Sequence, residues 1–140
     1  MTCEDLEQQA GEIAQAYFAA VKSDLLEHGG VLVDREKPLR RSPEFATRVF
    51  DKLAVILARS YSSGEFDFET ADMLANAFED ALVDLLIDFW PKGDGGPYPH
   101  RWSQVYEAFD AGEFDHFGRS SDPVREFTDP AIAEFLEKHG

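Results

Sequence analysis

FETADMLANAFEDALVDLLIDF, at residues 68–89, is the stretch that decides the fold. Its apolar residues recur at alternating steps of three and four, which predicts an α-helix with one continuous buried seam. Asp67 precedes the stretch as a helix cap, and Pro91 follows it as a stop. The seam consists of Phe68, Ala71, Ala75, Phe78, Leu82, Leu85 and Phe89. We expect Phe78, Leu82 and Leu85 to form the centre of the core.

The last third of this predicted helix is apolar on nearly every side. Its apolar residues outside the seam include Val83, Leu86, Ile87 and Trp90. Only Asp84 and Asp88 interrupt them. Since a helix of this kind is normally enclosed by its neighbours, the pattern predicts either the central helix of the domain or a helix that meets a partner chain.

Two helices are predicted before this stretch. Thr2, with Asp5 three residues later, caps a first amphipathic helix that ends at the glycines of 29–30. Residues 31–33 are apolar and β-branched, which favours an extended segment, and residues 34–42 are expected to form a charged loop. Ser42 followed by Pro43 starts a second helix, which ends at residues 62–64.

The C-terminal third is rich in aromatic residues, proline and glycine. Residues 91–100 carry a sustained loop signal, and a fourth helix then contains Trp102 and ends at Gly112. The Asp-Pro pairs at 122–123 and 129–130 each resemble an N-cap followed by a first-turn proline, and the second pair opens a terminal helix. No segment alternates as a strand would. We therefore predict an all-α fold: one domain over residues 1–140, a bundle of four to five helices with an irregular C-terminal third.

Composition limits the classes of partner. The chain has 140 residues, of which 44% are hydrophobic, and 28 acidic residues against 13 basic ones give a net charge of −15. Because such a charge repels phosphate backbones and anionic lipids, we expect neither nucleic acid nor membrane as a partner. The single cysteine cannot form an internal disulfide, and the N-terminus lacks a signal-peptide pattern. These features predict a cytoplasmic location.

Charge is distributed unevenly along the chain. Seven of the 13 basic residues fall between positions 31 and 59, whereas positions 60–91 contain eight acidic residues and no Lys or Arg. Four of these acids, Asp72, Asp80, Asp84 and Asp88, lie on one side of the third helix at multiples of four residues. Like charges at that spacing destabilise a helix by about 0.2–0.5 kcal/mol per pair. Either the second helix neutralises the third through Arg48, Lys52 and Arg59, or the third helix presents its charge to a basic partner.

Aromatic residues gather near the end of that helix. Trp90, Tyr98 and Trp102 follow closely after Asp88. These rings either pack an irregular loop against the bundle or act as exposed binding anchors, since Trp and Tyr are frequent interface hot spots.

Catalytic signals are weak. Glu4 with Glu7, and Glu69 with Asp72, resemble the paired acidic residues that hold Mg²⁺ in all-helical nucleotide pyrophosphohydrolases of the MazG type. That family separates its two pairs by a short helix–loop stretch, whereas some sixty residues intervene here. The four histidines have no metal-binding spacing, and no nucleophile motif is present. We predict no catalytic residue, no metal site and no cofactor.

In general character, though without a shared motif, the chain resembles small bacterial immunity and antitoxin-like proteins, which use acidic faces to block basic toxins. The resemblance implies a non-enzymatic protein-binding module with a basic protein as its partner. A metal-dependent all-α nucleotide hydrolase and a structural subunit of a larger assembly are the alternatives, and a homodimer through the third helix stays open. The candidate partner-binding residues are Asp72, Asp80, Asp84, Asp88, Trp90, Tyr98 and Trp102.

Overall fold

The computed structural model describes residues 2–31, 35–89 and 98–140. The α-helices in these ranges are α1 (Cys3–His28), α2 (Pro43–Ser62), α3 (Phe68–Phe89), α4 (His100–Ala111) and α5 (Asp129–His139). A 3₁₀ helix, Lys37–Arg41, precedes α2, and a π-helical turn, Val124–Thr128, precedes α5. The described ranges contain no strand, so the all-α prediction is confirmed. None of the helices found there is both long enough and apolar enough to cross a bilayer.

The predicted helix caps are present. The Thr2 hydroxyl accepts a hydrogen bond from the Asp5 amide at 3.1 Å, and the Asp5 carboxylate accepts one from the Thr2 amide at 3.3 Å. Ser42 caps α2 by accepting the amide of Phe45 at 3.1 Å. Asp67 caps α3, because its carboxylate accepts the amide of Thr70 at 2.8 Å. Each cap satisfies an amide that the first turn of a helix leaves without a partner.

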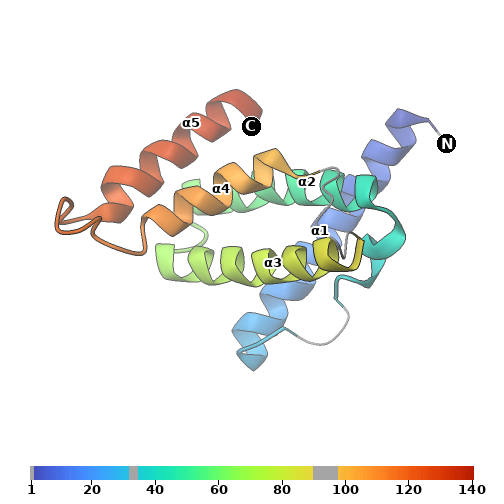
Figure 1. Ribbon diagram of the computed structural model, residues 1–140, viewed down its shortest axis with the longest axis horizontal. Coiled ribbons are helices and arrows are strands. Elements are labelled where there is room, and N and C mark those ends of the chain that lie inside the picture. Colours follow the sequence, from blue (N-terminus) through green and yellow to red (C-terminus); the bar gives the residue numbers. More distant parts are fainter. Residues whose placement is uncertain (1, 32–34, 90–97) are drawn as a thin grey trace.

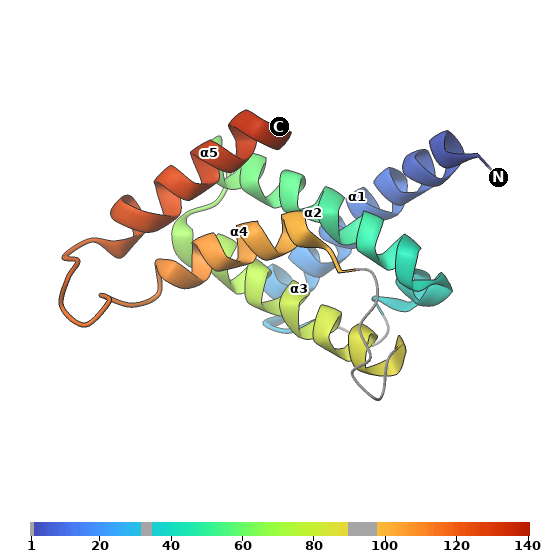
Figure 2. The ribbon, with the colours of Figure 1, turned by 45° about the horizontal axis from the view of Figure 1, so that its top comes forward.

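The centre of the bundle is α2, which contacts α1, α3, α4 and α5. In Figures 1 and 2, α2, α3 and α4 run roughly side by side, α1 crosses them, and α5 lies over α2 and α4. Among the helices of the described ranges, α3 packs mainly against α1, α2 and α4, and the exposed side chains of Val83 and Ile87 lie on its outer side. Of the two alternatives predicted for α3, the central position belongs to α2 instead, and the alternative that α3 meets a partner chain stays a prediction. Some of the apolar residues near the end of α3 therefore lie on an exposed face.

The seam of α3 faces the core as predicted. Phe78, Leu82 and Leu85 are each at most 1% exposed. The Phe78 ring lies 5.2 Å from that of Tyr17 and 5.9 Å from the rings of Phe18 and Trp102. Helices α1, α3 and α4 thus meet around one aromatic residue of α3.

Two local predictions fail, and two expected segments lie mostly outside the described residues. The charged segment before α2 contains the 3₁₀ helix. Helix α5 begins at Asp129 as predicted, but Asp129 makes no side-chain cap, because the π-helical turn leads directly into the helix. Asp122 is a cap as predicted: its carboxylate accepts the amide of Arg125 at 3.2 Å at the start of that turn. Pro130 lacks the amide that would bind the carbonyl four residues earlier, and the wider π turn accommodates its ring. The expected extended segment at 31–33 and the expected loop at 91–100 fall mostly on residues that are not described.

Candidate partner-binding face

The side of α3 opposite the seam is exposed and mixes acidic with apolar residues. We call this stripe the outer face of α3; it consists of Met73, Asp80, Val83, Asp84 and Ile87. Val83 is 45% exposed and Ile87 is 58% exposed. Residues at steps of three, four and seven share one side of a helix, so these two side chains lie beside the two carboxylates. The result is a narrow surface with both charge and apolar area.

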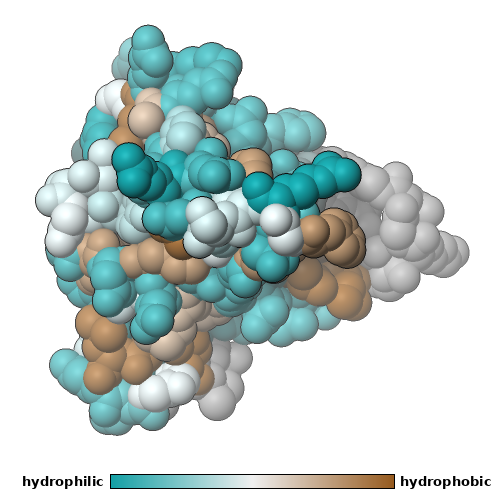
Figure 3. All heavy atoms as spheres, turned by 90° about the vertical axis from the view of Figure 1, so that its left-hand side faces the viewer, coloured by the Kyte–Doolittle hydropathy of each residue, from teal (hydrophilic) through white to brown (hydrophobic). Residues whose placement is uncertain are grey.

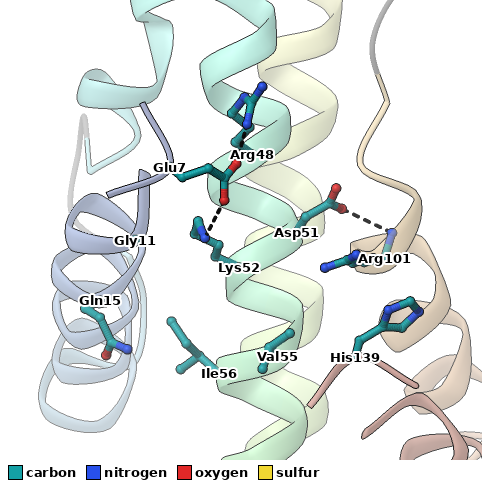
Figure 4. A pocket seen from close by; sticks show the side chains of 10 residues that line it. All are labelled: Glu7, Gly11, Gln15, Arg48, Asp51, Lys52, Val55, Ile56, Arg101 and His139. Carbon is teal, nitrogen blue, oxygen red and sulfur yellow. Dashed lines mark hydrogen bonds and ion pairs between the residues drawn. The ribbon is translucent and has the colours of Figure 1, made fainter. Parts of the chain in front are cut away.

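The basic residues of α2 do not reach this face. Arg48 forms an ion pair with Glu7 of α1, and Lys52 binds the same carboxylate at 2.8 Å (Figure 4). These two contacts hold the pKa of Glu7 below its usual value, with the Lys52 hydrogen bond as the largest cause. Arg59 donates a hydrogen bond to the backbone carbonyl of Gly140. The interpretation that α2 neutralises α3 is therefore wrong, because α2 turns these cations toward α1 and α5.

The α3 acids consequently differ in their surroundings. Asp88 pairs with Arg40 of the 3₁₀ helix. Across residues 2–31, 35–89 and 98–140, no ion pair reaches Asp80 or Asp84. Among the described residues, these two carboxylates are thus the part of the predicted acidic ridge that is exposed and has no ion pair.

Asp72 lies away from the outer face, at the contact of α3 with the end of α4. Asn76 bridges it to Glu113, donating to Asp72 at 3.5 Å and to Glu113 at 3.4 Å. Burial, followed by the hydrogen bond and charge of Glu113, raises the pKa of Asp72 to about 7. Since this side chain is engaged within the fold, its assignment to a partner-binding site finds no support in its position.

Of the three aromatic candidates, only Tyr98 lies at the described surface, 37% exposed. Trp102 is fully buried, with its ring 5.6 Å from Phe50 and 5.9 Å from Phe78, and its indole N–H donates to Glu79 at 3.4 Å. Its prediction as an exposed anchor is wrong, because α4 turns this residue toward α2 and α3. Trp90 lies outside the described residues.

The acidic pairs that resemble those of MazG-type enzymes are far apart. Glu4 and Glu7 lie near the start of α1, whereas Glu69 and Asp72 lie at the start of α3, at the other end of the bundle (Figure 1). Within the parts of the chain that the structure describes, no three His, Cys, Asp or Glu side chains are grouped so that they could hold a metal ion. The two pairs do not form one site.

Another exposed aromatic residue lies in the loop between α4 and the π turn. Phe117 is 97% exposed and has a φ of 63°, a left-handed conformation that is uncommon for a bulky residue. The end of the molecule that carries this loop is mostly hydrophilic, with separate hydrophobic areas (Figure 3). Phe117 belongs to the aromatic-rich C-terminal third but is not among the candidate partner-binding residues named from sequence.

Comparison with known proteins gives no relative: no protein-family model matches the chain, and neither a curated protein nor a solved structure matches it significantly. The chemistry of the chain's own surfaces is therefore the basis for a functional proposal. The residues that sequence reasoning missed are the exposed apolar ones, Val83 and Ile87. Their signal was the spread of apolar residues around the end of α3, which was also compatible with a partner chain.

Proposed function

We propose that this protein is a non-enzymatic protein-binding module whose outer face of α3 binds a basic protein surface that also presents apolar side chains. One observation carries the proposal. Val83 and Ile87 are about half exposed beside Asp80 and Asp84, which have no ion pair within the described residues. Apolar groups supply holding energy in an interface, while surrounding charges guide the encounter and select the partner.

A basic partner would relieve two unfavourable features together. Asp80 and Asp84 are like charges four residues apart, which destabilises a helix slightly. Val83 and Ile87 leave apolar area in water, which burial would remove at roughly 25 cal/mol per Å². A second copy of the chain would instead bring four carboxylates together, so charge disfavours a homodimer through this face. Masking of a basic protein is the most specific form of the proposal, and a cytoplasmic location is consistent with it.

The test uses a defined probe, an amphipathic helical peptide of Leu and Lys, titrated against the full chain. The variant Val83→Ser/Ile87→Ser removes the apolar part of the outer face. Leu26→Ser/Val31→Ser is a matched control on α1 and the segment after it, because Leu26 is 56% and Val31 42% exposed. We expect the α3 variant to weaken binding by about tenfold or more and the control to leave it nearly unchanged.

Charge variants separate the effect of the carboxylates on the association rate from the effect of the apolar side chains on the dissociation rate. Asp80→Asn/Asp84→Asn should lower the association rate and its dependence on salt, with a smaller effect on dissociation. Equal loss of affinity in the α3 and control serine variants would mean that the peptide binds exposed apolar side chains wherever they occur, and no loss in either would mean that it binds through overall charge. Either result would contradict the proposal. Association of the wild-type chain into dimers that Val83→Ser/Ile87→Ser abolishes would replace the basic partner by a second copy.

A further inference from the structure

A groove of about 590 Å³ lies on the other side of α2 from α3, between α1, α2 and the facing ends of α4 and α5 (Figure 4). Its volume falls in the range of about 300–1,000 Å³ typical of small-molecule sites. Four basic groups line it: Arg48 and Lys52 from α2, Arg101 from α4 and His139 from α5. In a chain with 28 acidic and 13 basic residues, three Lys or Arg side chains against two carboxylates is a local reversal of charge.

The two carboxylates of the groove are already engaged. Glu7 binds Arg48 and Lys52. Asp51 accepts the backbone amides of Arg101 and Trp102 at 3.1 and 3.3 Å, and so caps the start of α4. Burial has the largest effect on the pKa of Asp51 and raises it, whereas the two backbone hydrogen bonds lower it. The charge of Asp51 therefore compensates mainly the partial positive charge at the start of α4, and less the charges of the basic side chains around it.

Arg101 is the cation best placed to receive a ligand. Its side chain extends into the groove, and the ring of His139 lies on the same side (Figure 4). No ion pair involves the Arg101 guanidinium in residues 2–31, 35–89 and 98–140, whereas Arg48 and Lys52 share Glu7. A guanidinium can bind a carboxylate or a phosphate with two parallel hydrogen bonds.

The groove also has an apolar part and a glycine that keeps it open. Val55 and Ile56 line it and are only partly buried. Gly11 lies in the interior of α1, where glycine is a poor helix former. A Cβ at Gly11 would meet only the Lys52 side chain, at 3.7 and 3.9 Å, so packing does not require a glycine there. What the glycine preserves is open space between α1 and α2.

We propose that this groove binds a small organic anion, with an oxyanion on Arg101 and an apolar group over Val55 and Ile56. The oxyanion is a carboxylate or a phosphate monoester. The site is separate from the outer face of α3 and does not depend on the protein-binding proposal.

The experiment measures binding to the full chain at constant ionic strength by titration calorimetry and by NMR. Phenyl phosphate and benzoate are the two complete probes, because each contains both an oxyanion and an aromatic ring. Inorganic phosphate and benzyl alcohol are the half probes: the first has only the oxyanion, and the second has the ring without the oxyanion. At least one complete probe should bind about tenfold more tightly than either half probe, and the tighter of the two identifies the oxyanion.

Variants then locate the site. Arg101→Gln should weaken the tighter complete probe by about tenfold, whereas Arg119→Gln, an exposed arginine in the loop after α4, should have no effect. Gly11→Ala should weaken it a few-fold without changing the weak binding of inorganic phosphate. Val83→Ser/Ile87→Ser should leave this binding unchanged, which separates it from the face on α3.

Three results would overturn the proposal: no saturable binding of either complete probe, equal binding of inorganic phosphate, or equal losses in Arg101→Gln and Arg119→Gln. The last two would show attraction to charge alone. Arg101 is exposed and Gly11→Ala introduces a better helix former, so both variants should fold, and a melting curve checks this.

Discussion

Two helix contacts in this molecule each contain a glycine, and they differ in how completely they are filled. Where α4 ends against α3 and the π turn, a Cβ at Gly112 would lie 2.3 Å from the Thr128 hydroxyl and 2.9 Å from the Phe68 ring. Where α1 faces α2 in the groove, a Cβ at Gly11 would find its nearest neighbour at 3.7 Å. The first contact has no space for one more carbon, and the second has space for a ligand.

This difference separates side chains that hold the fold from those available for binding. The closed contact continues into the core, where Phe78, Trp102 and Phe109 are fully buried. The open groove leaves Arg101 exposed, and the outer face of α3 leaves Ile87 exposed. Loss of a side chain should therefore reduce stability strongly in the closed region and reduce binding, with little change in stability, in the open ones.

The largest effect is expected at Phe78. Phe78→Ala removes a ring that contacts Tyr17, Phe18 and Trp102, and should lower the free energy of unfolding by about 3–5 kcal/mol. Val83→Ala, on the open side of the same helix, should change it by less than about 0.5 kcal/mol. Urea denaturation measures both. Similar losses in the two variants would mean that the outer face is not open in solution.

Gly112→Ala probes the closed contact with a single carbon. The backbone at Gly112 has a φ of −81°, which alanine adopts readily, so the effect is one of space. The added Cβ must displace the Thr128 hydroxyl, which is buried and donates to the Ala108 carbonyl at 2.7 Å. We expect a loss of about 1–3 kcal/mol, measured by thermal or urea unfolding. The variant Gly112→Ala/Thr128→Ala should be less destabilised than the sum of its parts, and strict additivity would contradict this mechanism.

Much of the closed region could be predicted from sequence because its signals are local. A cap such as Ser42 acts on an amide three residues away, and the seam of α3 is a periodicity within one segment. These features depend on residues that are close in sequence and not on how the helices pack against one another. The five helices and the buried positions of Phe78, Leu82 and Leu85 follow from such signals.

The open regions depend on pairings between distant segments, which sequence spacing does not determine. The cations of α2 face either α1 or α3 according to how the helix is rotated, and the structure places Arg48 and Lys52 against Glu7. Trp102 follows a loop, so its position in the sequence was also compatible with exposure, yet it lies in the core. The groove combines four helices, and its one signal in the sequence was an isolated glycine, Gly11, inside a helical pattern.

A third prediction concerns pH at the edge of the closed contact. In the folded chain the pKa of Asp72 is about 7, against 3.8 for an ordinary aspartate, because of burial and the neighbouring Glu113. Between these values the folded state holds a proton that the unfolded state releases. Since stability falls with pH wherever the folded state binds more protons, it should decline as pH rises from about 4 to 7. The lowered pKa of Glu113 acts in the opposite direction, at pH values below its ordinary pKa of 4.5.

Asp72→Asn tests this by removing the titrating group while keeping a side chain of similar shape. Above pH 7 the variant should be more stable than wild type by about 1 kcal/mol, a figure that allows for solvent screening of a partly exposed group. At pH 4 the two proteins should be nearly equal. Parallel stability curves across this range would show that Asp72 does not carry the raised pKa.

The smallest effect on stability, and the most informative about the groove, is expected for Gly11→Ala. Alanine is favoured over glycine in a helix interior by about 1 kcal/mol, partly because it restricts the unfolded chain. The nearest atoms to the new methyl group are the methylenes of Lys52, at ordinary contact distances, so no strain opposes this gain. We expect the variant to gain about 0.5–1 kcal/mol in urea unfolding, opposite in sign to Gly112→Ala. If the same variant also binds the aryl anion less tightly, the glycine maintains the groove at the expense of helix stability. A loss of stability would instead mean that α1 and α2 are closed against each other, and there would then be no space for a ligand.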